Sequence, residues 1–278
     1  MLNGSLLPGA EGPHVVQALQ TTDQQLGELQ GGGSPHEKFE RYFQWAADSA
    51  LRLRGLLSEK AIGELVFTPS FYAILQVGPP TRTAGGMRLL GVEIETRRRV
   101  LQAAIDELRG QVARWSEDEL LVVLDTNVYV HGDRKIDEID WLDLTSHAEP
   151  VRLLIPMVVV DELDNLKRSK VRGRAAYTLA VLSRCLTGSQ LEGWLHPPEI
   201  RGSGSKSPVR VEVVLDPIGH ARLPLADDEI IDRALTIQRV AGRDVHLVTC
   251  DTGMHMRARP TGLKVHKHEP TPASSSPN

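Results

Sequence analysis

An apolar run that ends in an acid constrains the fold of this chain more than any other feature. Residues 120–124 are all apolar, and Asp125, Thr126 and Asn127 follow directly. Such a run predicts a strand buried on both faces, as in a parallel sheet that helices cover on each side. Ligands of open α/β sheets bind beyond the carboxyl ends of the strands, where Asp125 would lie. An acid there is more often a helix cap or turn residue than a catalyst, so Asp125 needs partners from elsewhere in the chain.

Strands and helices alternate after this run. Further strands are expected at residues 151–155, 209–215, 245–249 and 263–265. Helices are expected at 158–167, 173–186, 226–240 and 252–259, and 137–144 is mixed but mainly helical in character. This alternation predicts a three-layer α/β/α domain with a central parallel sheet, over residues 119–268.

The region before this domain is expected to be mainly helical. Residues 1–36 contain Gly and Pro clusters and predict a flexible leader with one short helix near 15–29. Residues 37–118 predict an accessory region with apolar helical stripes at 39–57 and 90–112, which pack within the chain or form a homodimer. Residues 62–77 fit either a strand or short helices. The Pro/Ser tail at 269–278 is expected to be disordered.

An arginine cluster at 97–99 has two interpretations. Charge runs usually lie in solvent, and Glu93 and Glu95 are available as partners one helical turn away. The alternative is a contact with RNA phosphates. The first interpretation is favoured.

Composition narrows the class of protein. With 41% hydrophobic and 24% charged residues, the chain is typical of a soluble globular protein. Aromatic residues make up only 4%, which argues against a base-stacking platform. Cys185 and Cys250 have no CxxC spacing, so a disulfide framework or a zinc site is not expected. No targeting or membrane-spanning segment is evident, and we expect a cytoplasmic protein.

Further acids share the predicted position of Asp125. Asp251 also follows an apolar strand, Glu162 lies in the first turns of a helix after a strand, and Asp227 and Asp228 open another helix. Each acid alone could be a cap or a solvated residue. Together they would meet at one edge of the sheet, where their charges repel unless a cation neutralises them. Oxygen ligands favour Mg²⁺ or Mn²⁺ over zinc, and such ions promote phosphodiester hydrolysis by activating water.

Four segments containing these acids resemble, in order and spacing, the motifs of the PIN domain, a metal-dependent ribonuclease fold. The segments are DTNVYV at 125–130, VVVDELDNLK at 158–167, ADDEIIDRAL at 226–235 and LVTCD at 247–251. The resemblance covers about residues 120–267. It implies that Asp125, Glu162, Asp227 and Asp251 hold the metal as the catalytic acids, with Thr126, Asn127, Asp228 and Thr249 supporting them.

A basic segment lies next to the predicted acidic edge. Its cations are Lys167, Arg168, Lys170, Arg172 and Arg174. They either form a solvated loop or bind the backbone of RNA.

The leading hypothesis is therefore a Mg²⁺- or Mn²⁺-dependent ribonuclease that hydrolyses the phosphodiester bonds of single-stranded or structured RNA by metal-activated water, and endonucleolytic cleavage is expected. The alternatives are a non-catalytic RNA-binding or scaffold protein that keeps the fold, and the toxin of a toxin-antitoxin pair. Such toxins resemble little more than the isolated PIN domain, so the long region before residue 119 argues against this alternative.

Overall fold

The computed structural model describes residues 5–29, 31–77, 84–116, 118–145, 150–198, 207–217 and 219–269. The chain divides into two compact units. The first contains residues 1–115 and 239–242, and the second contains 116–238 and 243–278. The division at 115/116 lies next to the boundary expected at 118/119. The disordered tail expected at 269–278 lies outside the described residues except for Glu269.

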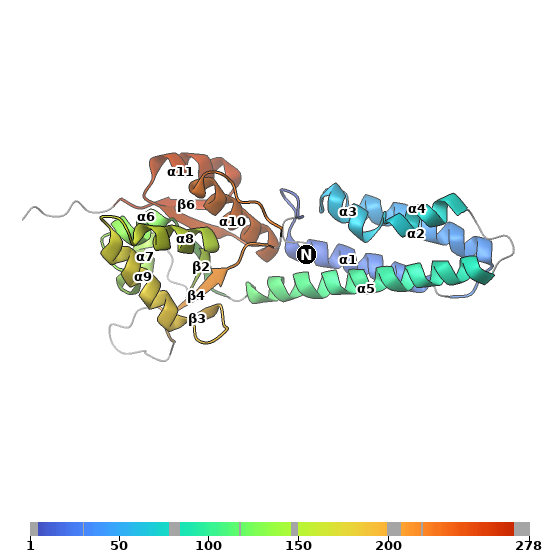
Figure 1. The fold of residues 1–278 in the computed structure, drawn as a ribbon, viewed down its shortest axis with the longest axis horizontal. Coiled ribbons are helices and arrows are strands. Elements are labelled where there is room, and N and C mark those ends of the chain that lie inside the picture. The colour runs from blue at the N-terminus through green and yellow to red at the C-terminus, as the bar shows by residue number, and fades with distance from the viewer. Residues whose placement is uncertain are drawn as a thin grey trace, which may run out of the picture. The chain divides into compact units, whose positions relative to one another are not determined.

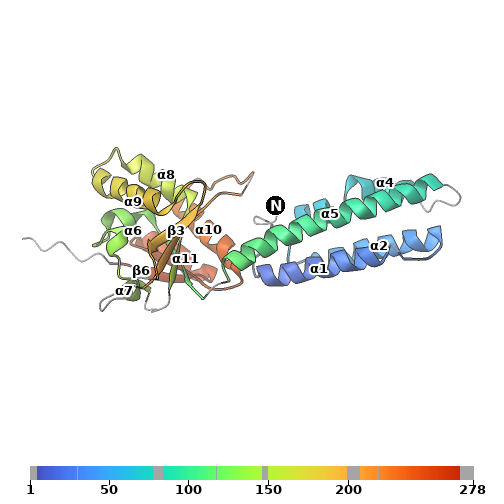
Figure 2. The same cartoon turned by 90° about the horizontal axis from the view of Figure 1, so that it is seen from below.

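The first unit is helical (Figures 1 and 2). Its helices are α1 (Gly12–Glu28), α2 (Pro35–Leu53), α3 (Glu59–Leu65), α4 (Pro69–Val77) and α5 (Ala84–Arg114). Helix α1 packs against α2 and α5. Its residues Val15, Leu19 and Leu26 are 0% exposed. The helix expected near 15–29 within the leader is α1, which begins three residues earlier, and its apolar stripe is buried against the neighbouring helices.

Local caps explain where the helices of this unit begin. Ser34 and Glu37 form a capping box at the start of α2, in which the Glu37 side chain accepts a hydrogen bond of 2.7 Å from the Ser34 backbone N–H. The Ser58 hydroxyl accepts from the Ala61 N–H at α3, and the Thr68 hydroxyl accepts from the Phe71 N–H at α4. Residues 62–77, for which strand and helix were both open, thus belong to two short helices joined by a turn.

The arginine cluster of α5 is paired within the first unit. Arg97 and Arg99 form ion pairs with Glu93 and Glu95, at 3.1 and 3.2 Å. Arg98 reaches Asp23 of α1, at 3.3 Å. Arg97 and Arg99 thus have the expected partners one helical turn away. The Arg99 pair lies in solvent as expected, whereas the side chains of Arg97 and Glu93 are only 12% and 6% exposed.

The second unit is an α/β domain with a six-stranded, mostly parallel sheet. The strands are β1 (Leu120–Leu124), β2 (Val151–Pro156), β3 (Glu192–His196), β4 (Val209–Val214), β5 (Val245–Thr249) and β6 (Lys264–Lys267). They lie in the order β3-β4-β2-β1-β5-β6. All residues of β1, β2 and β5 are buried, whereas the edge strands β3 and β6 are partly exposed. The continuous apolar runs in the sequence therefore mark the central strands.

Helices connect the strands of this sheet. They are α6 (Thr126–His131), α7 (Trp141–Thr145), α8 (Met157–Leu166), α9 (Arg172–Cys185), α10 (Ala226–Ala241) and α11 (Thr252–Ala258), with short 3₁₀ turns at Ile136–Glu138 and Arg259–Thr261. Helices α6, α8 and α9 pack together, and α10 and α11 belong to the later part of the domain, coloured orange to red (Figure 1). The expected α/β architecture is confirmed.

The strand order creates a switch point between β1 and β5. From β1 the chain moves to β2 and then β4 on one side, and afterwards crosses back to β5 and β6 on the other side of β1. Right-handed crossovers in opposite directions place their helices on opposite faces of the sheet. Ligands of such sheets bind beyond the carboxyl ends of the strands at the switch point, and Asp125 and Asp251 follow β1 and β5 there.

Two elements differ from the sequence prediction. Strand β3, for which no strand was expected, pairs antiparallel with β4, so the sheet is not wholly parallel. A Cβ at Gly193 would lie 1.8 Å from the Cys185 carbonyl oxygen, so this edge strand passes too close to the end of α9 for any larger residue. Helix α6 was also not expected, because it is only six residues long and follows the strand without a linker.

A buried ion-pair cluster occupies the other end of the sheet. Arg152 of β2 is 1% exposed and donates hydrogen bonds to Glu119 and Glu212, at 2.6 and 2.9 Å.

Among the described residues, no helix combines the length and the apolar character needed to cross a membrane.

Candidate metal and phosphodiester site

Asp125 is the most deeply buried acid at the switch point. It caps α6, where its carboxylate accepts a hydrogen bond from the Asn127 backbone N–H, and it is 1% exposed. Its Oδ2 accepts a hydrogen bond of 2.9 Å from the Thr249 hydroxyl. The pKa of Asp125 is raised to about 6. Burial is the main cause and the charges of Asp227 and Glu162 add to it, whereas the two hydrogen bonds act in the opposite direction. The capping role and a functional role are therefore compatible in one residue.

Asp251 is joined to Asp125 through Thr249. The Thr249 hydroxyl accepts a hydrogen bond of 2.9 Å from the Asp251 backbone N–H while it donates to Asp125. The Asp251 carboxylate caps α11 by accepting from the Met254 N–H, at 2.6 Å. Asp251 thus follows β5 in the same way that Asp125 follows β1, and the two strands are adjacent in the sheet.

Glu162 approaches from α8. Its Oε2 accepts a hydrogen bond of 2.6 Å from the hydroxyl of Thr126, which follows Asp125 in the chain. This bond ties α8 to the carboxyl end of β1. Thr126 and Thr249 therefore each donate a hydrogen bond to one of the predicted metal ligands.

Asp227 and Asp228 open α10 and share one arginine. Arg257 of α11 donates from Nη2 to Asp227 and from Nε to Asp228, both at 2.8 Å. The Asp227 and Asp228 side chains are 36% and 37% exposed, so both acids are much closer to solvent than Asp125. Sequence reasoning missed Arg257, because its two partners are about 30 residues away along the chain.

The donor set fits a divalent cation that prefers oxygen. The pKa of Asp125 is raised mainly by burial and to a smaller extent by the charges of Asp227 and Glu162, and a cation would relieve both effects. Carboxylates without Cys or His match Mg²⁺ or Mn²⁺. The four acids are not drawn together tightly: in the described part of the chain, a different group is the only one with three ligand atoms all within 4.8 Å of one another. Asp227 in particular is paired with Arg257.

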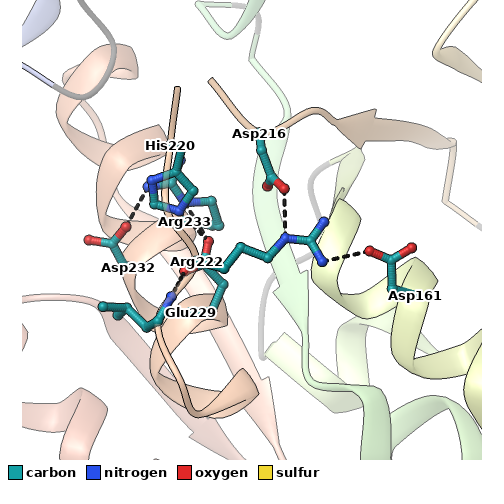
Figure 3. A network of polar contacts seen from close by, with 8 residues as sticks. Asp161, Asp216, His220, Arg222, Glu229, Asp232 and Arg233 are labelled. Atoms are coloured by element: carbon teal, nitrogen blue, oxygen red, sulfur yellow. Dashed lines mark hydrogen bonds and ion pairs between the residues drawn. The ribbon is translucent and has the colours of Figure 1, made fainter. Parts of the chain in front are cut away.

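That other group consists of His220, Glu229 and Asp232. Figure 3 shows that it surrounds Arg233 of α10. The fully buried Glu229 forms an ion pair with Arg233 at 3.2 Å and a contact with His220 Nε2 at 2.7 Å, and Arg233 also pairs with Asp232. Since an arginine already supplies the positive charge, we interpret this cluster as structural.

The same network holds the loop between β4 and α10. The Leu223 backbone N–H donates to Glu229, at 2.9 Å. Arg222 donates to Asp216 at 2.7 Å and to Asp161 of α8 at 2.6 Å (Figure 3). Asp161 directly precedes Glu162, so Arg222 links the helix that carries Glu162 to the loop that leads to Asp227. The sequence analysis assigned no role to Arg222, Glu229 or His220. The only local signal was that Glu229 is an acid in the first turn of α10.

The basic segment surrounds the end of α8 and the start of α9. Lys167, Arg168, Lys170 and Arg172 are exposed, and Lys167 forms an ion pair with Asp164 at 2.7 Å. The side chains of Arg168, Lys170 and Arg172 form no hydrogen bond or ion pair with described residues. Arg174 differs, because its guanidinium donates to the backbone carbonyls of Gly132 and Arg134. Of the five predicted cations, Arg174 is thus engaged in holding the loop after α6.

Comparison with known proteins agrees with this geometry. A family model for the PIN domain matches residues 122–269, which is more than half of the chain and spans all the acids described above. The PIN domain is a nuclease-type fold, and its members typically use divalent metal ions. No curated protein matches the chain. The chain belongs to the PIN domain family.

Proposed function

We propose that this protein is a Mg²⁺- or Mn²⁺-dependent ribonuclease that cleaves RNA endonucleolytically, leaving a 5′-phosphate and a 3′-hydroxyl. The observation that carries the proposal is the convergence of acids on Asp125, whose pKa is raised by burial and by the charges of Asp227 and Glu162. Repulsion between neighbouring carboxylates does not stabilise the fold. The placement of these acids beside one another therefore favours a functional role.

Each acid would have a distinct part in holding the ion. Asp125, Glu162, Asp227 and Asp251 would supply carboxylate oxygens, and Thr249 and Thr126 would keep Asp125 and Glu162 oriented through the hydrogen bonds described above. Asn127 and Asp228 would border the site. When bound, the ion would supply the Lewis acidity that activates water and stabilises the leaving oxygen.

RNA would reach this site along the basic segment. Arg168, Lys170 and Arg172 are exposed cations next to α8, the helix that carries Glu162. They would offset the repulsion between the acids and the phosphate backbone. Arg174 would support the neighbouring loop instead of binding RNA.

The test is cleavage of a panel of end-labelled RNAs with Mg²⁺, Mn²⁺ or excess chelator. We expect cleavage by the wild type with either ion, and a loss of at least about a hundredfold in Asp125→Asn and in Asp251→Asn. The matched control is Asp164→Asn, which removes an exposed carboxylate of the same helix as Glu162 and should cleave normally. Equal cleavage by the wild type and the Asp125 variant, or cleavage in chelator, would contradict the proposal. RNA binding without cleavage in any ion would favour the non-catalytic alternative.

A further inference from the structure

Arg257 lies where a positive charge would compete with a metal ion. Its Nη2 and Nε hold Asp227 and Asp228 at 2.8 Å each. The third nitrogen, Nη1, lies in the same neighbourhood as Asp251, since a Cβ built on Gly253 would lie 3.2 Å from Arg257 Nη1 and 3.1 Å from Asp251 Oδ1. One guanidinium therefore holds two acids at the start of α10, one of which is a proposed metal ligand.

We propose that Arg257 exchanges partners when the metal binds: it neutralises Asp227 in the metal-free protein, releases it to the ion, and then binds a phosphate of the RNA. This inference deepens the proposed ribonuclease function and rests on it for the identity of the substrate. Arg257 would then bind the substrate, whereas the acids would bind the metal ion.

The exposure of the ion pair supports the release step. The Arg257 and Asp227 side chains are 43% and 36% exposed. Ion pairs this exposed to solvent are weak. A divalent ion that bonds directly to the carboxylate oxygen can displace such a partner, because it carries twice the charge and approaches more closely.

The position of Asp228 supports the second step. The hydrogen bond to Asp228 uses the Nε–H, whereas the bond to Asp227 uses Nη2, so the two acids are held by different nitrogens. Release of Asp227 would therefore leave Arg257 anchored by Asp228 through Nε, with Nη2 and Nη1 available to bind a phosphate. A planar guanidinium with two free nitrogens is suited to phosphate recognition.

A purely structural role for Arg257 makes the opposite prediction. If Arg257 only joined α11 to α10, its removal would loosen Asp227 and weaken metal binding. If Arg257 competes with the metal, its removal would strengthen metal binding. The sign of the change in metal affinity therefore separates the two roles.

The first experiment is a calorimetric titration of the full chain with Mn²⁺. We expect Arg257→Gln to bind Mn²⁺ about two- to tenfold more tightly than the wild type. Arg257→Lys should lie between them, since a single ammonium cannot hold both carboxylates. The control is Arg259→Gln, which removes an exposed charge two residues further on and should leave the affinity unchanged. Unchanged or weaker Mn²⁺ binding by Arg257→Gln would overturn the exchange.

The second experiment measures binding of a single-stranded phosphorothioate RNA with saturating Mn²⁺ and with chelator. Arg257→Gln should weaken binding about tenfold with Mn²⁺ and less than about twofold in chelator, where the acids occupy the guanidinium. Equal weakening in both conditions would overturn the phosphate contact. A wild type that binds Mn²⁺ and RNA but cleaves nothing would overturn the ribonuclease proposal alone, because neither of these two measurements requires cleavage.

Discussion

The Thr249 hydroxyl donates a hydrogen bond of 2.9 Å to Asp125 Oδ2, and so joins the carboxyl ends of β5 and β1. The same oxygen accepts from the Asp251 backbone N–H. One hydroxyl therefore orients the two acids that follow adjacent strands.

Replacing Thr249 by valine should disturb both acids. The hydrogen bond to Asp125 favours its ionised form, so Thr249→Val should raise the pKa of Asp125 above that of the wild type and weaken Mg²⁺ binding at neutral pH. The Asp251 N–H would lose its acceptor, and we expect a loss of about 1–3 kcal/mol in the free energy of unfolding. Urea denaturation and Mg²⁺ titration measure the two effects. Thr252→Ala, at an exposed position of α11, is the control and should change neither.

The stability of the metal-free protein should depend on pH through Asp125. Its pKa is about 6 when folded, compared with an ordinary value of 3.8. The folded state therefore binds more protons between these values, and the free energy of unfolding should fall as the pH rises from 4 to above 6, by up to roughly 3 kcal/mol. Asp125→Asn should be more stable than the wild type at pH 7.5 and differ little near pH 4. Urea denaturation in chelator checks this, and a variant less stable than the wild type at pH 7.5 would contradict it.

Arg152 should be essential for stability and not for the site. Its removal would leave Glu119 and Glu212 as buried carboxylates with one cation fewer. We expect Arg152→Met to lower the free energy of unfolding by about 3–5 kcal/mol. Combining it with Glu119→Gln and Glu212→Gln should recover part of this loss, because the buried negative charges are removed as well. A triple variant less stable than Arg152→Met would argue against unpaired charge as the cause.

The loop between β4 and α10 should depend on Arg222. Without this side chain, the loop loses its bonds to Asp161 and Asp216. We expect Arg222→Leu to be cleaved by thermolysin about three- to tenfold faster near Leu223 than the wild type. The control Arg168→Leu removes an exposed cation that forms no ion pair with described residues, and its loop should be cleaved at the wild-type rate. Equal protection of the Arg222 variant would show that the contacts of Glu229 suffice.

The exposed cations should determine how RNA affinity responds to salt. Lys170→Glu combined with Arg172→Glu should weaken RNA binding and reduce the slope of log affinity against log salt by about 0.7 for each lost phosphate contact. The control is Arg99→Glu with Arg109→Glu, which reverses two exposed charges on α5. Fluorescence anisotropy between low and physiological salt measures the slope. An equal decrease in both double variants would indicate a general charge effect.

The sequence by itself determined the central strands and the positions of the acids along the chain. Residues 120–124 are all apolar, and 151–155 and 245–249 are mainly apolar, because these strands are buried on both faces, and this property can be read without a structure. Asp125 was identified because it directly follows such a run, and Asp251 because it lies two residues after one. Strand β3 and the packing of α1 were not predicted, because an edge strand lacks a continuous apolar run and the leader contains Gly and Pro clusters.

Only the tertiary structure decided which charges meet. Arg222 lies 61 residues from Asp161, and Arg257 lies about 30 residues from Asp227 and Asp228, so no local pattern relates them. These pairs form because the sheet order brings the helices after β2, β4 and β5 to one edge. The sequence therefore specified the acids around Asp125, while the fold brought Arg222 and Arg257 into contact with the acids on their helices.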